Sequence, residues 1–438
     1  MMTITRISQL KTAPCIKALV PAALLAAGIF LAACKPSASA GVAHDDPTIS
    51  AQVGLVTLAQ LRADAENGDA TAQNQLGFMY QKGQGVVKND AQAVSWFRKA
   101  AEQGFAKAQY NLGAMYDTGQ GVAQDYTQAG FWYRKAAEQG FAQAQYNLGV
   151  MYRTGQGVAK DESQAVSWYR KAAEQGNAAA QYSLGQMYRA GIGVAHDDTQ
   201  TVFWYRKAAE QGYANAQYNL GVRYQEGKGV PKDDAQAVFW WRKAAEQGYA
   251  HAQYNLGVMY DNGQGIAKDD MQAAIWYRKA AEQGVAQAQN NLGAKYRAGQ
   301  GVARDNVQAA FWYRKAAEQG DANAQYSLGS MYHEGLGVTK DYTQAAFWTR
   351  KAAEQNDTSA QNNLGVMYQE GQGVVKDYTQ AASWYRKAAE QGYAPAQNNL
   401  GLMYRNGQGV PKDEAQAREW FRKAAAQGDA NARKALPK

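Results

Sequence analysis

A segment of 36 residues is repeated ten times along this chain of 438 residues. Each copy contains the pattern A-Q-x-x-L-G-x-x-Y, then G-x-G, then a stretch that ends in W-x-R-K-A-A. The first copy begins at Ala72 and the last at Ala396. A fixed period of this length is typical of supersecondary units that stack in series, each in contact mainly with its neighbours. The repeat therefore predicts an elongated array rather than a globule with one central core.

The first half of each unit has the periodicity of a helix. In the third unit, Ala144, Leu148, Met151 and Tyr152 are spaced i, i+4, i+7 and i+8, which places them on one helix face. Gly149 lies inside this helix, and its counterpart is glycine in all ten copies. Glycine at such a position costs about 1 kcal/mol relative to alanine. We therefore expect a neighbouring helix to approach closely there.

A tight turn and a second helix follow. We predict that Gly155 ends the first helix as a left-handed cap and that Gly157 completes the turn. Asp161 and Gln164 have the spacing of a capping box, in which each side chain accepts or donates a hydrogen bond at the start of a helix. Each unit is therefore predicted to be a hairpin of two helices that cannot bury its apolar face alone.

The buried face of the second helix is predicted to contain the repeated tryptophan. In the third unit this residue is Trp168, with Ala172 one turn later and Gly176 closing the helix. Tryptophan recurs at the same position in all ten units, from Trp96 to Trp420. We interpret these residues as core and not as a platform for sugars.

These landmarks resemble the Sel-one-like repeat (SLR), a relative of the tetratricopeptide repeat with a longer loop between its helices. The resemblance covers Ala72 to about Ala430. It implies an all-α fold, an α/α solenoid that forms a right-handed superhelix, with first helices lining a concave groove. The usual role that it implies is that of an adaptor or scaffold. We divide the chain into a signal peptide (1–33), a lipidated cysteine with a flexible tether (34–56), an N-terminal capping helix (57–71), ten repeats (72–431) and a truncated C-terminal cap (432–438).

The amino terminus has the features of an export signal. Three basic residues precede an apolar stretch over 18–33, which ends in Leu-Ala-Ala before Cys34. This ending resembles the lipobox of bacterial lipoproteins, which implies cleavage before Cys34 and acylation of that residue. Lys35 replaces the aspartate that is associated with inner-membrane retention, so we expect an outer-membrane lipid anchor facing the periplasm. A plain secretory signal and an uncleaved anchor are the alternatives.

Composition excludes several kinds of function. The formal charge of +8 includes three basic residues of the predicted signal peptide, so the remainder has too small an excess to favour nucleic acid. Both cysteines lie in the first 34 residues, and the four histidines occupy unrelated repeat positions. We therefore predict no metal site, no cofactor and no enzymatic activity. The repeated Arg-Lys pair is followed by glutamate, which favours ion pairs within an exposed helix face.

A row of tyrosines and asparagines on the first helices is the candidate binding site. In the tetratricopeptide fold, which the repeat resembles, these positions face the groove. Amides can hydrogen-bond the backbone of a bound peptide, and tyrosine rings supply apolar area. Alternatively, these side chains bond within or between hairpins and bind nothing. The candidate residues are Tyr110, Asn111, Tyr146, Asn147, Arg153, Tyr218, Asn219, Tyr254, Asn255, Asn291, Asn363 and Asn399.

Two functions of different classes fit this sequence. The first is a non-enzymatic adaptor of the bacterial cell envelope, anchored to the membrane through Cys34, that holds a protein or peptide in its groove. The second is an immunity lipoprotein that neutralises an envelope-directed toxin such as a lipase, because some SLR lipoproteins have that role.

Overall fold

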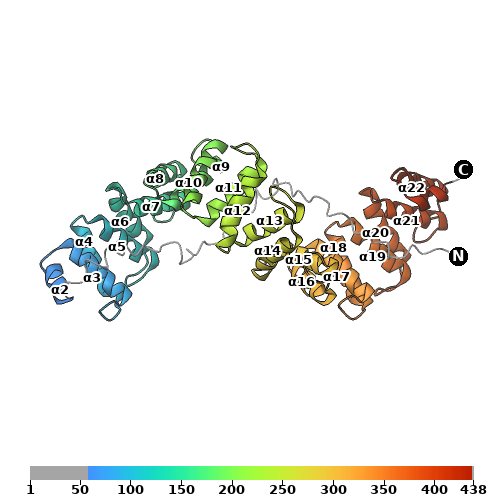
Figure 1. The fold of residues 1–438 in the computed structure, drawn as a ribbon, viewed down its shortest axis with the longest axis horizontal. Helices are drawn as coiled ribbons and strands as arrows, with labels where there is room; N and C mark the ends of the chain where they lie inside the picture. The colour runs from blue at the N-terminus through green and yellow to red at the C-terminus, as the bar shows by residue number, and fades with distance from the viewer. Residues whose placement is uncertain (1–57, 437–438) are drawn as a thin grey trace. The chain divides into compact units, whose positions relative to one another are not determined.

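The computed structural model describes residues 58–436, and within these residues the regular structure is entirely helical. The described part opens with α2 (Leu58–Glu66) and ends with α23 (Ala430–Ala435). One compact unit begins at Asp64 and contains every helical hairpin. Figure 1 shows these hairpins following one another in chain order from α3 to α22. The chain is thus an α/α solenoid, as predicted.

Each unit contains two helices of 13 residues. The first helices of the ten units are α3 (Ala70–Lys82), α5 (Ala106–Thr118), α7 (Ala142–Thr154), α9 (Ala178–Ala190), α11 (Ala214–Glu226), α13 (Ala250–Asn262), α15 (Ala286–Ala298), α17 (Ala322–Glu334), α19 (Thr358–Glu370) and α21 (Ala394–Asn406). The second helices are α4 (Asp90–Glu102), α6 (Tyr126–Glu138), α8 (Glu162–Glu174), α10 (Asp198–Glu210), α12 (Asp234–Glu246), α14 (Asp270–Glu282), α16 (Asn306–Glu318), α18 (Tyr342–Glu354), α20 (Tyr378–Glu390) and α22 (Glu414–Ala426).

The glycine inside each first helix is required by an aromatic ring of the second helix. A Cβ atom added to Gly149 would lie 2.7 Å from Cδ1 of Tyr169 and 3.3 Å from the carbonyl oxygen of Ala165. The same clash with a ring recurs from Gly77 to Gly401, except at Gly329, where the second helix carries Thr349. The close approach that the sequence predicted is therefore confirmed, and the ring lies where a Cβ would be.

The ends of the helices are capped largely as predicted. Gly155 has a φ of 77° and its N–H donates to Met151. The side chain of Asp161 accepts from the backbone N–H of Gln164. The second half of the predicted capping box is not used, because the N–H of Asp161 donates to the carbonyl of Tyr152 at 2.9 Å. This bond ties the start of α8 to the last turn of α7.

The aromatic residue at the centre of nine of the ten hairpins follows the repeated tryptophan. Tyr169 is 1% exposed, whereas Trp168 is only half-buried. Trp168 packs against the cluster that contains Tyr133 and Leu148, so it covers the junction with the preceding unit. The tryptophans are therefore part of the apolar packing, as predicted, but they lie mainly at the junctions between units.

Two sets of hydrogen bonds join successive units. The invariant glutamine of each first helix donates to a carbonyl at the end of the preceding second helix, as Gln217 does to Ala209 at 3.0 Å. Its own oxygen accepts from the glutamine that closes the second helix of its unit, Gln247, at 2.7 Å. This relay is present in all ten units and satisfies a buried amide that sequence reasoning had left without a role.

The repeated arginine makes the second set. Arg170 of α8 donates to the hydroxyl of Tyr188 in the next unit at 2.8 Å. Nine arginines make the equivalent bond, from Arg98 to Arg386. The neighbouring lysine lies over an aromatic ring, as Lys171 does over Trp168 at 4.0 Å. The predicted pairing of the arginines with glutamate on the same helix is therefore wrong.

The predicted signal peptide, Cys34 and the tether lie outside the described residues. Among the residues that the structure does describe, no helix has both the length and the apolar character that crossing a bilayer requires.

Candidate protein-interaction surface

We call the surface formed by the third and fourth positions of the sequence pattern on successive first helices the first-helix face. Asparagines on this face bond to the preceding unit. The Nδ2 atom of Asn111 donates to Oδ1 of Asn74 at 2.9 Å, and that of Asn219 donates to the hydroxyl of Tyr182 at 3.3 Å. The partners are 37 residues apart in the chain, so each bond joins two units.

Two more of the predicted asparagines also donate a hydrogen bond to the preceding unit. Asn363 donates to the hydroxyl of Tyr326 at 3.2 Å, and Asn399 donates to Asn362 at 3.0 Å. Asn291 instead accepts from its neighbour Asn290 at 3.4 Å. These bonds correspond to the alternative in which the amides connect hairpins. Binding of a partner by the same residues stays a prediction.

The tyrosines of this face are half-buried. Burial raises the pKa of Tyr110, and a hydrogen bond with Asn147 partly offsets that rise. Burial likewise raises the pKa of Tyr218, where Asn255 has the offsetting effect. The hydroxyls therefore remain protonated at neutral pH and can donate as well as accept hydrogen bonds. Tyr146 and Tyr254 lie near the rings of Tyr169 and Tyr277, with centroids 5.7 and 6.0 Å apart. Arg153 is exposed at the margin of the face.

Aromatic residues that sequence reasoning missed extend this face. Tyr213 and Tyr249 immediately precede α11 and α13, where other units have an aspartate that caps the helix. The ring of Tyr213 lies 5.3 Å from that of Tyr182, and the ring of Tyr249 lies 5.0 Å from that of Tyr218. We call these four residues the tyrosine cluster. The alternation of aromatic and Asp or Asn residues at this repeat position was the available sequence signal.

His251 lies at the edge of the tyrosine cluster. Its ring centroid is 6.3 Å from that of Tyr218 and 6.2 Å from that of Tyr249. Burial is the main cause that raises the pKa of both tyrosines. The cluster thus combines rigid apolar rings with hydroxyl and imidazole groups, which is a composition typical of the centre of a protein interface.

A buried lysine replaces methionine in the seventh unit. The Nζ atom of Lys295 lies 2.5 Å from Asp261 and 2.8 Å from Asp270, and its side chain is 4% exposed. Eight of the other nine units have methionine here, from Met79 to Met403, and Arg223 fills the ninth. The two aspartates are partly exposed, so water screens the ion pairs.

We expect Lys295→Met to leave the free energy of unfolding unchanged or to raise it by up to about 2 kcal/mol, because methionine fills this position in eight units and the two aspartates left behind are partly exposed to water. The hydrogen bond from Lys295 lowers the pKa of Asp270. The wild type should therefore lose this contribution as the pH falls below about 4, through the folded-state pKa of Asp270, and the variant should not. Urea unfolding at neutral and acidic pH measures both effects. A variant that is less stable at both pH values would contradict this account.

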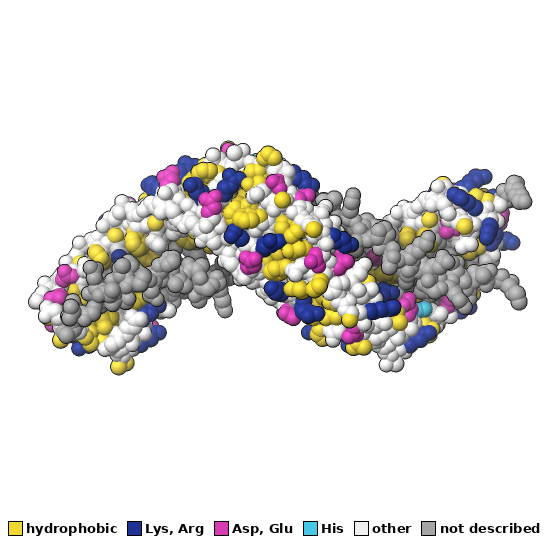
Figure 2. Space-filling model, in the orientation of Figure 1, with side chains coloured by type: hydrophobic (Ala, Val, Ile, Leu, Met, Phe, Trp, Pro, Cys, Tyr) yellow, Lys and Arg dark blue, Asp and Glu magenta, His cyan; other side chains and the backbone are white. Residues whose placement is uncertain are grey.

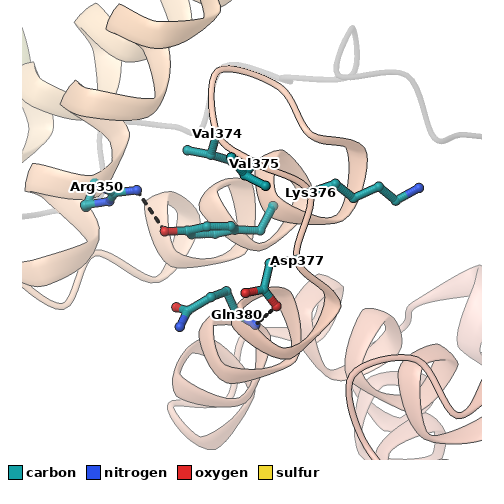
Figure 3. A pocket seen from close by; sticks show the side chains of 7 residues that line it. Arg350, Val374, Val375, Lys376, Asp377 and Gln380 are labelled. Carbon is teal, nitrogen blue, oxygen red and sulfur yellow. Dashed lines mark hydrogen bonds between the residues drawn. The ribbon is translucent and has the colours of Figure 1, made fainter.

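A small open cavity of about 510 Å³ lies beside the loop that precedes α20 (Figure 3). Its polar side chains already have partners within the chain. Arg350 donates to the hydroxyl of Tyr368 at 2.8 Å, and Asp377 accepts from the backbone N–H of Gln380 at 3.0 Å. Lys376 points away from the cavity in Figure 3. The cavity therefore presents no arrangement of acid, base and nucleophile.

Metal-binding residues are also dispersed. In the described part of the chain, no group of three His, Cys, Asp or Glu side chains could hold a metal ion. His196 contacts the carbonyl of Arg189 at 2.9 Å, and His333 contacts Gln372 at 3.0 Å in a different part of the array.

Comparison with known proteins identifies the repeat. The family described as the Sel1 repeat matches ten consecutive segments, from 70–105 to 394–429. The chain belongs to the Sel1 repeat family. Each matched segment begins at the first residue of a first helix, two residues before the alanine that opens the sequence pattern. Sel1-repeat solenoids are in general non-enzymatic scaffolds for protein interaction.

Two solved structures are similar over most of this Sel1-repeat chain. A protective antigen present in uropathogenic Escherichia coli, which displays an SLR fold, is 41% identical, with a TM-score of 0.71 over 87% of this chain and 91% of that one. A Sel1 repeat protein from Oxalobacter formigenes is 38% identical, with a TM-score of 0.55 over 69% of this chain and 88% of that one.

One curated protein matches a short segment. The secretory immunoglobulin A-binding protein EsiB of Escherichia coli O6:H1 is 46% identical over 48 residues. This segment is 11% of the present chain and 10% of EsiB, so the chain matches only a small fraction of that protein's length.

Proposed function

We propose that this Sel1-repeat protein is a non-enzymatic scaffold of the bacterial cell envelope that holds a protein or peptide against its first-helix face. The observation that carries the proposal is the tyrosine cluster, in which half-buried rings of two successive repeats pack in pairs, Tyr182 with Tyr213 and Tyr218 with Tyr249. Tyrosine loses little conformational entropy on binding and supplies both apolar area and a hydroxyl.

The predicted row of amides supports the same face. Asn219 lies beside the cluster and bonds to Tyr182, which orients the ring before a partner arrives. A preoriented group loses less entropy on binding than a mobile one. The neighbouring Asn147 and Asn255 bond to Tyr110 and Tyr218 in the same manner. The proposed contact surface is therefore already ordered in the free protein.

The envelope location is proposed from the amino terminus. The sequence Leu31-Ala32-Ala33-Cys34 supports acylation of Cys34, and several acyl chains on one residue provide a stable membrane anchor. The similarity to a protective antigen and to an immunoglobulin A-binding protein supports a role in which the chain meets other proteins. Lys35 supports the outer membrane over the inner one.

Partner binding by the tyrosine cluster is tested with substitutions that already occur at the same positions in other units. Asparagine and aspartate occupy the cluster positions in other units, as Asn290 and Asp321 do. We expect the combined change Tyr182→Asn, Tyr213→Asp, Tyr218→Asn and Tyr249→Asp to preserve folding and to weaken partner binding at least 10-fold, since the cluster provides the anchors. The partner is obtained by affinity capture from intact envelopes and mass spectrometry, and its affinity is then measured by calorimetry.

The control is Tyr126→Asp, which changes a tyrosine on a second helix to the residue found at Asp198. Its affinity for the captured partner should equal that of the wild type. A quadruple variant that binds as tightly as the wild type would refute the proposed face. Capture of an envelope-directed toxin would select the alternative function, an immunity protein. Absence of acyl chains on Cys34, in mass spectrometry of the protein purified from the membrane fraction, would refute the lipid anchor.

A further inference from the structure

A row of exposed apolar side chains lies on the second helices, away from the residues of the first-helix face. The phenylalanine row consists of Phe203, Phe239, Ile275, Phe311 and Phe347, which occupy one repeat position in five consecutive units. Each is between 40% and 48% exposed. Figure 2 shows a band of apolar side chains with Lys and Arg at its margins over α12, α14 and α16. Contiguous apolar surface of this kind marks an interaction site more often than scattered residues do.

The phenylalanines of this row are held in place from two sides. Phe239 stands edge-on to Trp240, with centroids 4.9 Å apart and an interplanar angle of 85°. The Nζ atom of Lys243, one turn later, lies 5.2 Å from the centroid of the Phe239 ring. The pairs Phe203–Lys207, Phe311–Lys315 and Phe347–Lys351 repeat this arrangement at 5.7 to 5.9 Å. The rings are thus ordered before any partner binds.

The two margins of the row differ in charge. On one side, the positions four residues before the row are uncharged, and they include Met271 and Val307, which are 60% and 63% exposed. On the other side lies a row of lysines, and beyond it a row of glutamates. The lysines are Lys207, Lys243, Lys279, Lys315 and Lys351, and the glutamates are Glu210, Glu246, Glu282, Glu318 and Glu354.

We propose that the phenylalanine row is a docking site for an acidic amphipathic helix of a partner protein. Along a second helix, the lysine lies about 6 Å and the glutamate about 10.5 Å from the row, at 1.5 Å per residue. A helix about 10 Å wide that is centred on the row covers the apolar residues and reaches the lysines, but not the glutamates. Its apolar stripe contacts the rings, and acidic residues along one edge meet the lysines.

Charge complementarity favours an acidic helix over an anionic bilayer and over a second copy of this chain. An anionic bilayer covers the lysine and glutamate rows together, and five positive charges then face five negative ones without net attraction. A second copy arranged antiparallel with row against row brings lysines opposite lysines. A second copy arranged parallel places lysines opposite uncharged side chains and near Asp198 and Asp270, which already pair with Arg223 and Lys295 of their own chain. Only a narrow acidic partner is attracted by the lysines without being repelled by the glutamates.

The repeat provides a matched variant for the test. Serine occupies this position in three units, as Ser95, Ser167 and Ser383, so Phe→Ser is compatible with the fold. The test variant of the full chain carries Phe203→Ser, Phe239→Ser, Phe311→Ser and Phe347→Ser. The control carries Phe131→Ser, which changes an equally exposed phenylalanine whose neighbouring units have serine. Circular dichroism should show the same helix content for all three proteins.

A random 20-residue peptide library is displayed and panned on the wild type after counter-selection on the test variant. We expect enriched peptides with net negative charge and apolar residues at helical spacing. Their affinity should fall at least 10-fold in the test variant and less than 2-fold in the control. Exchange of Lys207, Lys243, Lys315 and Lys351 for glutamine should reduce the salt dependence of binding.

Three results would overturn the assignment. The first is the absence of enrichment or the enrichment of basic peptides. The second is binding of the wild type, but not of the test variant, to phosphatidylglycerol vesicles, which would assign the row to a membrane. The third is self-association in sedimentation experiments that the test variant abolishes. The binding test of the tyrosine cluster uses other residues and another partner, so its outcome is independent of the outcome of the peptide experiment.

Discussion

Replacing Gly157 by alanine is expected to destabilise the solenoid by roughly 2–5 kcal/mol. Gly157 has a φ of 70°, which costs an L-residue about 1–2 kcal/mol. A Cβ there would also overlap the carbonyl oxygen of Tyr126, which belongs to the preceding unit. Backbone cannot move as a side chain can, so the overlap adds about 1–3 kcal/mol. Urea unfolding measures the total, and hydrogen exchange should place the loss at the junction of units two and three.

Gly176→Ala is the matched control for this effect. Gly176 has a φ of 89°, yet nothing lies within 4 Å of the position that its Cβ would occupy. Only the conformational cost of about 1–2 kcal/mol is therefore expected. Asn356 occupies the equivalent position in the eighth unit with a φ of 68°, so Gly176→Asn should cost less still. Equal destabilisation by Gly157→Ala and Gly176→Ala would show that contact between units is unimportant.

Tyr169→Ala is expected to cost about 3–5 kcal/mol, because it removes a fully buried ring from the centre of a hairpin. The ring fills the space above Gly149, where the two helices approach most closely. Thermal and urea unfolding of the full chain give the magnitude. Because units contact mainly their neighbours, exchange protection should fall in units two to four and persist at the ends of the array.

The variant Tyr169→Phe distinguishes the contribution of the ring to stability from that of its hydroxyl. Phe97 and Phe421 fill the same position in the first and tenth units, both at most 1% exposed. We therefore expect this change to lie within about 0.5 kcal/mol of the wild type. Loss of stability as large as that of the alanine variant would mean that the hydroxyl, rather than packing of the ring, holds the hairpin together.

The predictions from sequence were correct for features that depend on interactions within a few residues. Gly155 and Asp161 cap their helices because a left-handed backbone and an acceptor side chain act within a few residues. The role of the arginines was missed, since Arg170 is 18 residues from its partner Tyr188. The greater burial of the ring after each tryptophan was missed for a related reason: Trp168 and Tyr169 are adjacent in sequence, and only the rotation of α8 against its neighbours buries the second ring more deeply.

The candidate site shows the same division. The row containing Asn219 and Tyr218 was visible as a repeated pattern, because identical positions on successive first helices must share a face. That Asn219 bonds to Tyr182, and that Tyr213 packs on that same ring, depends on contacts between units.

The amino-acid sequence by itself determined the period, the two helices of each unit, their caps and the family. Local backbone preferences and apolar spacing suffice for these features. Only the tertiary structure decided which ring fills each hairpin, which amides and arginines join the units, and which phenylalanines stay exposed. Those outcomes depend on how one hairpin rotates onto the next, and that angle is set by side-chain packing between adjacent units rather than within one segment of sequence.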